Sequence, residues 1–214
     1  MIISLATTKG GSGKSTLALN LAATLSKLDF PTMLIDTDPQ GSLNRAFQRR
    51  DTQPEKIQKT MAKDLIFEWE TTGAIVEKLD RYRPAGIIVV DAFGYDHPLQ
   101  WSIIQKSDVV LIPSSLGYQD VEVALEVAEK AATVSNARLI INHHRKNSVL
   151  SSYIRDFLSG SPSVKLHDPY VYDRQAYALS FAAGLAACEA DPRSSAAKEF
   201  DAFTQSLIQS VGLK

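Results

Sequence analysis

Short uninterrupted apolar runs alternate along this chain with longer segments in which apolar residues recur at helical spacing. The runs predict buried strands at residues 2–7, 32–36, 86–91, 108–113 and 138–142. The spaced segments predict helices at 15–28, 73–82, 120–134, 148–158, 174–183 and 191–211, whereas the remainder of 40–83 is less regular, with helical pieces. Strand–helix alternation of this kind predicts an α/β fold, a mostly parallel twisted sheet with helices on both faces.

The last helix shows the clearest periodicity. Asp191 and Pro192 suit its N-cap and first position, and Gly212 suits its end. The residues expected on its inward face are Ala196, Phe200, Phe203, Leu207 and Val211.

Composition is that of an ordinary globular protein. The 214 residues are 44% hydrophobic and 22% charged, which suits one domain over residues 1–214. Because the net charge is −1, nucleic acid would have to be contacted through a local patch. The single cysteine, Cys188, excludes a disulfide or an all-cysteine cluster within one chain. No apolar run is as long as a membrane span and no signal peptide is evident, so a cytoplasmic location is expected.

The first expected strand leads into a glycine-rich segment. It matches the phosphate-binding loop G-x-x-x-x-G-K-[ST], except that Thr8 replaces the first glycine and a second lysine, Lys9, follows it. The glycines let backbone N–H groups converge on an anion at the positive end of the next helix. Lys14 would face the β- and γ-phosphates, and Ser15 would bind Mg²⁺. The predicted nucleotide site is Lys9, Gly10, Gly11, Ser12, Gly13, Lys14, Ser15 and Thr16.

Two aspartates follow the second expected strand. On an extended strand Asp36 and Asp38 would project to one side, at the edge where parallel strands face a ligand. Asp36 would hold Mg²⁺ through water, and Asp38 would orient or deprotonate the attacking water. A turn with a capping aspartate is the alternative.

A third segment carries a possible metal ligand. The strand at 86–91 ends in Asp91, and Gly94 follows three residues later. This is the layout of a Walker B strand and switch, in which Asp91 supports Mg²⁺ and Gly94 frees the backbone near the γ-phosphate.

Polar residues at the end of the strand at 138–142 and just after it are further candidates for a binding site. Asn142 would read the adenine edge, although a turn asparagine is an equal alternative. His143 and His144 have no carboxylate or cysteine nearby at ligand spacing, so both are expected on the surface. Cys188 is expected in the core.

Segments 9–15, 36–40 and 89–94 together resemble the ParA/MinD family of deviant-Walker ATPases. Segments 108–113 and 173–177 resemble the family's small plasmid-partition (ParF-like) members, so the resemblance covers nearly the whole chain. It implies a P-loop NTPase fold with ATP and Mg²⁺ as cofactors. It also implies catalytic roles for Lys9, Lys14 and Asp38, with Lys9 reaching the nucleotide of the other chain in an ATP-bound homodimer, as an arginine finger does.

The resemblance further implies non-specific binding of double-stranded DNA by the dimer, a ParB-like centromere-binding partner and a nucleoid-associated location. No helix-turn-helix domain precedes the loop, so autorepression is not expected. Phe93 is bulkier than the small residue or proline that the family's switch would place there. The DNA-binding candidates are Arg145, Lys146, Arg155, Lys165 and Arg174. For these a solvated mixed surface is the alternative. A second basic cluster comprises Arg45, Arg49, Arg50, Lys56, Lys59 and Lys63, of which Arg45, Arg49 and Arg50 are the rival candidates.

Other functions of related proteins fit less well. Iron–sulfur carriers need cysteines, tyrosine autokinases need a tyrosine-rich tail, and a membrane-bound relative needs a basic amphipathic tail, whereas 206–214 hold one basic residue. A conjugation-assisting or MinD-like positioning ATPase of the same fold remains open. So does a metabolic P-loop ligase, which would consume ATP only with its small-molecule substrate.

Overall fold

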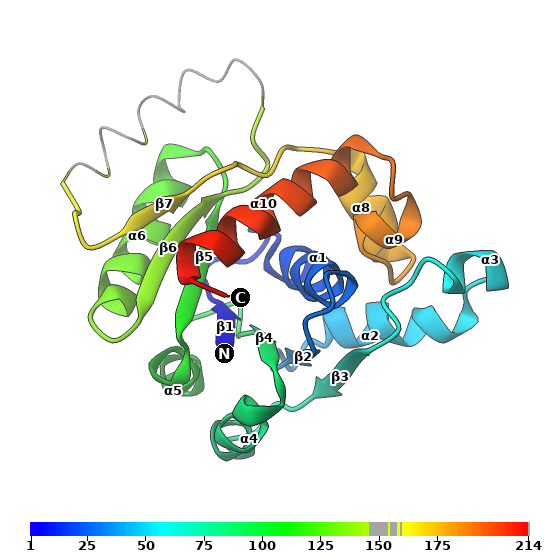
Figure 1. The fold of residues 1–214 in the computed structure, drawn as a ribbon. Coiled ribbons are helices and arrows are strands. Elements are labelled where there is room, and N and C mark those ends of the chain that lie inside the picture. The colour runs from blue at the N-terminus through cyan, green and yellow to red at the C-terminus, as the bar shows by residue number, and fades with distance from the viewer. Residues whose placement is uncertain (146–153, 155–157, 159, 214) are drawn as a thin grey trace.

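The computed structural model describes residues 1–145, 154, 158 and 160–213. Its centre is a seven-stranded sheet in the order β3-β2-β4-β1-β5-β6-β7 (Figure 1). Every neighbouring pair of strands is parallel. The strands are β1 (Ile2–Leu5), β2 (Thr32–Asp36), β3 (Leu65–Trp69), β4 (Ile87–Asp91), β5 (Val109–Ser114), β6 (Asn136–Ile141) and β7 (Lys165–His167).

Helices cover both faces of this sheet. One face carries α1 (Lys14–Lys27), α2 (Ser42–Gln48), α8 (Gln175–Ala182), α9 (Ala187–Ala190) and α10 (Ser195–Val211). The other carries α4 (Ala74–Tyr82), α5 (Pro98–Lys106) and α6 (Tyr118–Ala132). Short helical turns at α3 (Glu55–Gln58), Arg49–Thr52 and Arg83–Ala85 complete the described elements. The predicted α/β architecture is therefore confirmed.

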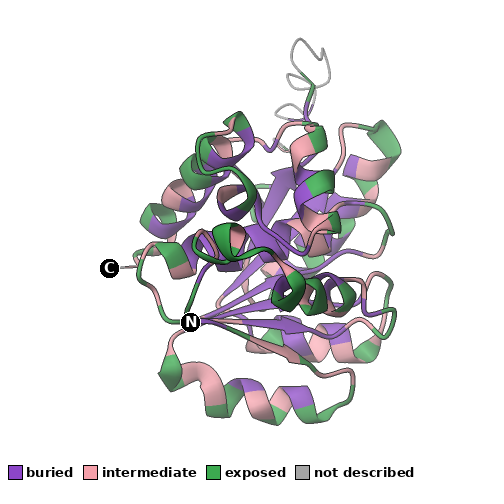
Figure 2. Ribbon diagram, turned by 90° about the vertical axis from the view of Figure 1, so that its right-hand side faces the viewer, coloured by how far each residue is buried: buried purple, intermediate pink, exposed green. Residues whose placement is uncertain are grey.

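The strands are apolar on both sides because both sides are covered. In β1, Ile3 and Leu5 pack into the cluster beneath α1 and α10, whereas Ile2 packs beneath α4 and α5. In β5, Leu111 packs on the side of α1 and α10, whereas Val110 packs on the opposite side, beneath α6. The buried residues accordingly concentrate along the strands (Figure 2). A rigid two-sided core of this kind fixes the loops that follow the strands.

Two strands and one helix start differ from the sequence prediction. The sequence predicts no strand at β3. The structure shows why: β3 lies at the edge of the sheet, Ile66 and Trp69 are exposed, and the strand therefore lacks a continuous apolar pattern. β7 is only three residues long. The last helix begins at Ser195 rather than Asp191, because Ser194 Oγ accepts the capping hydrogen bond from Ala197 N at 3.1 Å.

The helix predicted at 148–158 lies outside the described residues, except for Ile154 and Leu158. Across the described part of the chain, none of the helices combines the length and apolarity that crossing a membrane requires.

Candidate functional site

The glycine-rich loop joins β1 to α1 at the carboxyl edge of the sheet, beside the centre of the strand order. Gly11 and Gly13 adopt left-handed φ values of 83° and 82°, which other residues adopt only with strain. The backbone N–H groups of Lys14, Ser15 and Thr16, in the first turn of α1, form no hydrogen bond with another described residue. These free donors at a helix N-terminus fit the predicted anion site.

Asn142 braces this loop from the end of β6. Its side chain is buried and Nδ2 donates to the Ser12 carbonyl at 2.8 Å. A Cβ on Gly13 would lie 2.3 Å from Asn142 Nδ2, so the loop approaches the amide too closely for any side chain. The contact assigns Asn142 a role in holding the loop; its predicted contact with adenine remains a prediction.

Lys14 and Asp91 form a buried ion pair beneath the loop. Lys14 Nζ lies 2.8 Å from Asp91 Oδ1, and the two side chains are 7% and 0% exposed. The other carboxylate oxygen, Asp91 Oδ2, is buried and has no hydrogen-bond partner in the described residues. An unsatisfied carboxylate oxygen in such a position is costly, and a cation or its bound water would satisfy it.

Asp36 and Asp38 do not share one side as expected, because β2 ends at Asp36 and the chain turns. Asp36 is fully buried, and its oxygens accept backbone N–H bonds from Asp38 at 3.0 Å and Asn44 at 2.9 Å. Burial, and next the charge of neighbouring Asp91, raises the pKa of Asp36 to about 7. Asp36 therefore organises the turn, while Asp38 alone lines the loop cavity. A metal role for Asp36 remains a prediction.

The segment after β4 brings an aromatic group to the same cavity. Phe93 points into the core, stacked on His97 with ring centroids 4.6 Å apart, and so does not block the site. Gly94 and Tyr95 line the cavity, and a Cβ on Gly94 would lie 3.5 Å from Asp38 Oδ2. The bulky Phe93 is thus accommodated below the loop, and sequence reasoning missed Tyr95.

Lys9 lies at the mouth of the cavity and is bound within its own chain. Its Nζ forms an ion pair with Asp120, in the first turn of α6, and the side chains are 53% and 23% exposed. Asp120 also accepts from Ser115 Oγ at 2.5 Å. Lys9, followed by Ser115, lowers the pKa of the Asp120 carboxyl. Sequence reasoning placed Asp120 at the start of the helix expected over 120–134 and gave it no role in the site, so this partner of Lys9 was missed.

The cavity fits a nucleotide phosphate and Mg²⁺. It has a volume of about 270 Å³ and is lined by residues 9–16 together with Asp38, Gln40, Ser42, Gly94 and Tyr95. Among the described residues no group of three or more His, Cys, Asp or Glu side chains is placed to hold a metal. Mg²⁺ needs no such group, since it keeps water and phosphate oxygens and uses one or two protein ligands. Ser15, which lines the cavity, is a suitable donor, and the unpartnered oxygen of Asp91 lies in the buried pair beneath the loop.

The DNA-binding candidates are only partly brought together. Arg145 is exposed but lies 3.1 Å from Asp173, and Arg174 pairs with Glu199 at 2.8 Å. Lys165 is exposed on β7 and has no ion pair within the described residues. Lys146 and Arg155 lie outside the described residues.

Two other predictions need correction. In the rival basic cluster, Arg50 is buried and makes a bidentate pair with Glu189 at 2.6 and 2.7 Å, so its side chain does not face solvent. His144, expected on the surface, is buried between Tyr170 and Tyr172. His143 is half exposed.

Comparison with known proteins finds similarity over most of the chain, including the glycine-rich loop. Residues 3–185 match the model of the CobQ/CobB/MinD/ParA nucleotide binding domain. A protein named ParA from Rhizobium radiobacter is 26% identical over 198 residues, covering 86% of this chain and 83% of the relative.

Two solved structures show the same fold at low sequence identity. The septum site-determining protein MinD of Pyrococcus horikoshii OT3, complexed with Mg-ADP, has a TM-score of 0.73 and 14% identity, over 99% of this chain and 97% of that one. An ATP complex of a variant of Cyanothece McdA has a TM-score of 0.69 and 18% identity, over 100% and 96%.

Proposed function

The chain belongs to the CobQ/CobB/MinD/ParA nucleotide-binding domain family, and from that premise we propose that it is a Mg²⁺-dependent ATPase of the partition type. It dimerises on ATP, binds double-stranded DNA without sequence preference and segregates DNA together with a ParB-like centromere-binding protein. The ATP and Mg-ADP complexes of its structural neighbours support the choice of cofactors.

Different residues around the cavity would bind the phosphates, hold the metal and activate the attacking water. Free N–H groups at the start of α1 and the Lys14 ammonium bind the phosphates. Ser15 and Asp91 would hold Mg²⁺, which when bound withdraws charge from the phosphate oxygens. Asp38, on the cavity wall, orients the attacking water and accepts its proton.

One observation carries the partition assignment over the metabolic one, namely a second lysine at the mouth of the phosphate cavity. Lys14 is buried and paired with Asp91, whereas Lys9 is about half exposed and, within the part of the chain that the structure describes, pairs with Asp120 alone. A surface ion pair of this kind is weak, so Lys9 can exchange Asp120 for the phosphates of a nucleotide in a second chain. That exchange would couple ATP to dimerisation.

The DNA surface of the dimer is proposed around Arg145, with Lys146, Arg155, Lys165 and Arg174 as further candidates. Lys165 lies level with Arg138 near the amino end of β6, whereas Arg145 lies beyond the carboxyl end of that strand, so the two would contact a duplex at separate points. Arg174 is the weakest of the candidates, because it pairs at 2.8 Å with the nearly buried carboxylate of Glu199. Dimerisation would double the patch and so raise affinity for a duplex.

ATP hydrolysis with and without duplex DNA, and gel shifts at several salt concentrations, test the assignment. We expect binding that requires ATP, ignores sequence and falls with salt at a log–log slope of about −0.9 per phosphate contacted. Replacing Arg145 and Lys165 with Ala should flatten that slope and leave ATP-dependent dimerisation intact, whereas Arg193→Ala serves as a matched control. Absence of ATP-dependent DNA binding at low salt would favour the metabolic ligase.

A further inference from the structure

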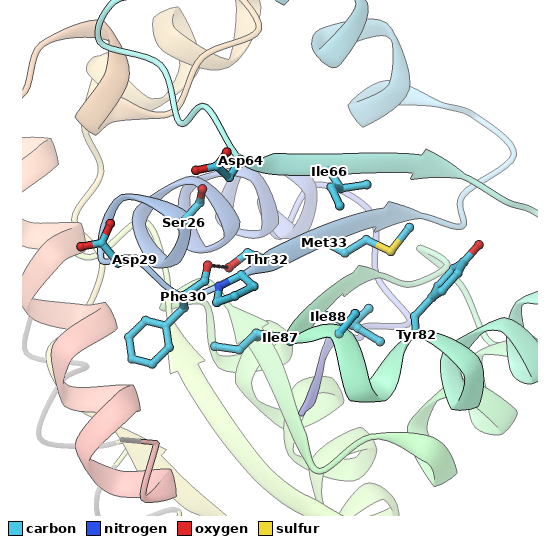
Figure 3. A pocket seen from close by; sticks show the side chains of 13 residues that line it. Ser26, Asp29, Phe30, Thr32, Met33, Asp64, Ile66, Tyr82, Ile87 and Ile88 are labelled. Carbon is cyan, nitrogen blue, oxygen red and sulfur yellow. Dashed lines mark hydrogen bonds between the residues drawn. The ribbon is translucent and has the colours of Figure 1, made fainter.

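A second and larger cavity lies at the opposite edge of the sheet, where the strands begin (Figure 3). Its volume is about 620 Å³, against about 270 Å³ around the loop. It is formed by the amino ends of β2, β3 and β4 and by the turns that precede them. It shares no lining residue with the loop cavity, so nothing in the proposed ATPase mechanism uses it.

The floor of this cavity is apolar. Met33, Ile66, Tyr82 and Ile88 come from three strands and the end of α4, and they lie near one another in Figure 3. Met33 and Tyr82 sit at the margin of the core cluster beneath α4 and α5. Ile66 is 61% exposed, because β3 is the last strand on this side of the sheet. An apolar surface that ends in an exposed isoleucine suits an apolar ligand.

The rim carries unneutralised negative charge. Asp29, in the turn before β2, and Asp64, just before β3, are exposed, and neither forms an ion pair with another described residue. The acids farther along β3 differ, since Glu68 and Glu70 both pair with Lys78 at 2.6 and 2.5 Å. Two free carboxylates beside an apolar floor therefore call for a ligand that is both cationic and apolar.

We propose that this cavity binds an apolar segment of a partner protein that carries lysine or arginine beside its apolar residues. The apolar side chains cover Met33, Ile66 and Ile88, and basic groups beside them pair with Asp29 and with Asp64. A second copy of this chain is a poor occupant, because meeting face to face it would set its own Asp29 and Asp64 against the same carboxylates. Lying at the opposite edge from the loop, the segment binds whether or not nucleotide is present.

Two synthetic pentapeptides test the proposal, each with three leucines and blocked ends. One has a lysine at each end and the other a glutamate. Amide NMR titration of the whole chain without nucleotide should show saturable shifts at Met33, Ile66 and Ile88 with the lysine peptide only. Equal binding of the glutamate peptide, shifts centred elsewhere, or no saturable binding in the millimolar range would overturn the proposal.

Two variants separate the contributions of charge and apolar surface. Replacing Asp29 and Asp64 together with Asn should weaken lysine-peptide binding about five- to tenfold at low salt, as two exposed ion pairs would. Ile66→Thr should weaken it by a similar factor, whereas Leu179→Thr, at another exposed apolar residue on α8, should not. Unchanged affinity in the Asn variant overturns the proposal. ATP binding should be unaltered in every variant, which keeps this test separate from that of the proposed function.

Discussion

The two edges of the sheet treat charge in opposite ways. At the carboxyl edge, Lys14, Asp36 and Asp91 are buried and depend on one another. At the amino edge, Asp29 and Asp64 lie in solvent around an apolar cavity. Buried charges need partners, so the charged side chains at the carboxyl edge hold one fixed arrangement. A bound ligand would supply the partner that Asp91 still lacks. Exposed charges cost little, so the amino edge can present them without altering the fold.

The largest effect should come from Lys14→Ala. It removes the charge that we propose binds the phosphates and leaves Asp91 buried without its partner, so we expect loss of ATP binding and a loss of about 3–5 kcal/mol in the free energy of unfolding. Denaturant unfolding and nucleotide titration would measure both. Adding Asp91→Asn should restore part of the stability without restoring binding; a Lys14→Ala chain that binds ATP normally would contradict the loop assignment.

Asp36 should make stability depend on pH. Its pKa rises from 3.8 to about 7 on folding, so the folded chain holds the extra proton between those values. Stability from this group is therefore present below about pH 4 and lost as pH rises to about 7, by about 2–4 kcal/mol. Denaturant unfolding at pH 5 and pH 8 should show that Asp36→Asn flattens the difference. Identical pH profiles of unfolding for the two chains would contradict a raised pKa of Asp36 in the folded chain.

Gly13→Ala should disturb the loop more than Gly10→Ala. A methyl group at Gly13 meets Asn142 and must adopt a left-handed φ, whereas one at Gly10 has nothing within 4 Å. We expect a loss of about 2 kcal/mol for Gly13→Ala and less than about 0.5 kcal/mol for Gly10→Ala. Thermal unfolding measures both losses, and equal losses would contradict the role of Asn142 as a brace.

Release of Lys9 should have a moderate effect. Asp120→Asn removes its partner within the chain, so ATP-dependent dimerisation should strengthen, by up to about tenfold if each chain regains the energy of one exposed ion pair. Sedimentation with ATP measures this, and Glu122→Gln, an exposed acid on the same helix, is the control. Weaker dimerisation of Asp120→Asn would indicate that the Lys9–Asp120 pair belongs to the dimer.

The smallest effect on folding is expected at the amino edge. Replacing Asp29 and Asp64 with Asn should change the free energy of unfolding by less than about 0.5 kcal/mol, because both are exposed and neither forms an ion pair with a residue that the structure describes. A larger loss in a denaturant titration would show that these carboxylates support the fold, and the comparison between the two edges would fail.

The sequence predicted the loop and five of the seven strands because both follow from local patterns, namely glycines at fixed spacing and uninterrupted apolar runs. It missed β3, whose place at the edge gives it a mixed exposure that resembles irregular structure. It placed Asp36 and Asp38 on one side because it could not see that β2 ends between them. Asp120, Tyr95 and Glu189 were missed for another reason, since each meets its partner only through tertiary folding.

The bidentate pair between Arg50 and Glu189 has a consequence for where the folding unit ends. The family match stops at residue 185, but Glu189 lies beyond that point and holds Arg50 in the interior. A chain cut after residue 185 would strand a guanidinium in an apolar surrounding and remove Phe200 and Phe203 from the core. α9 and α10 therefore pack as part of the core, although the family match ends before them.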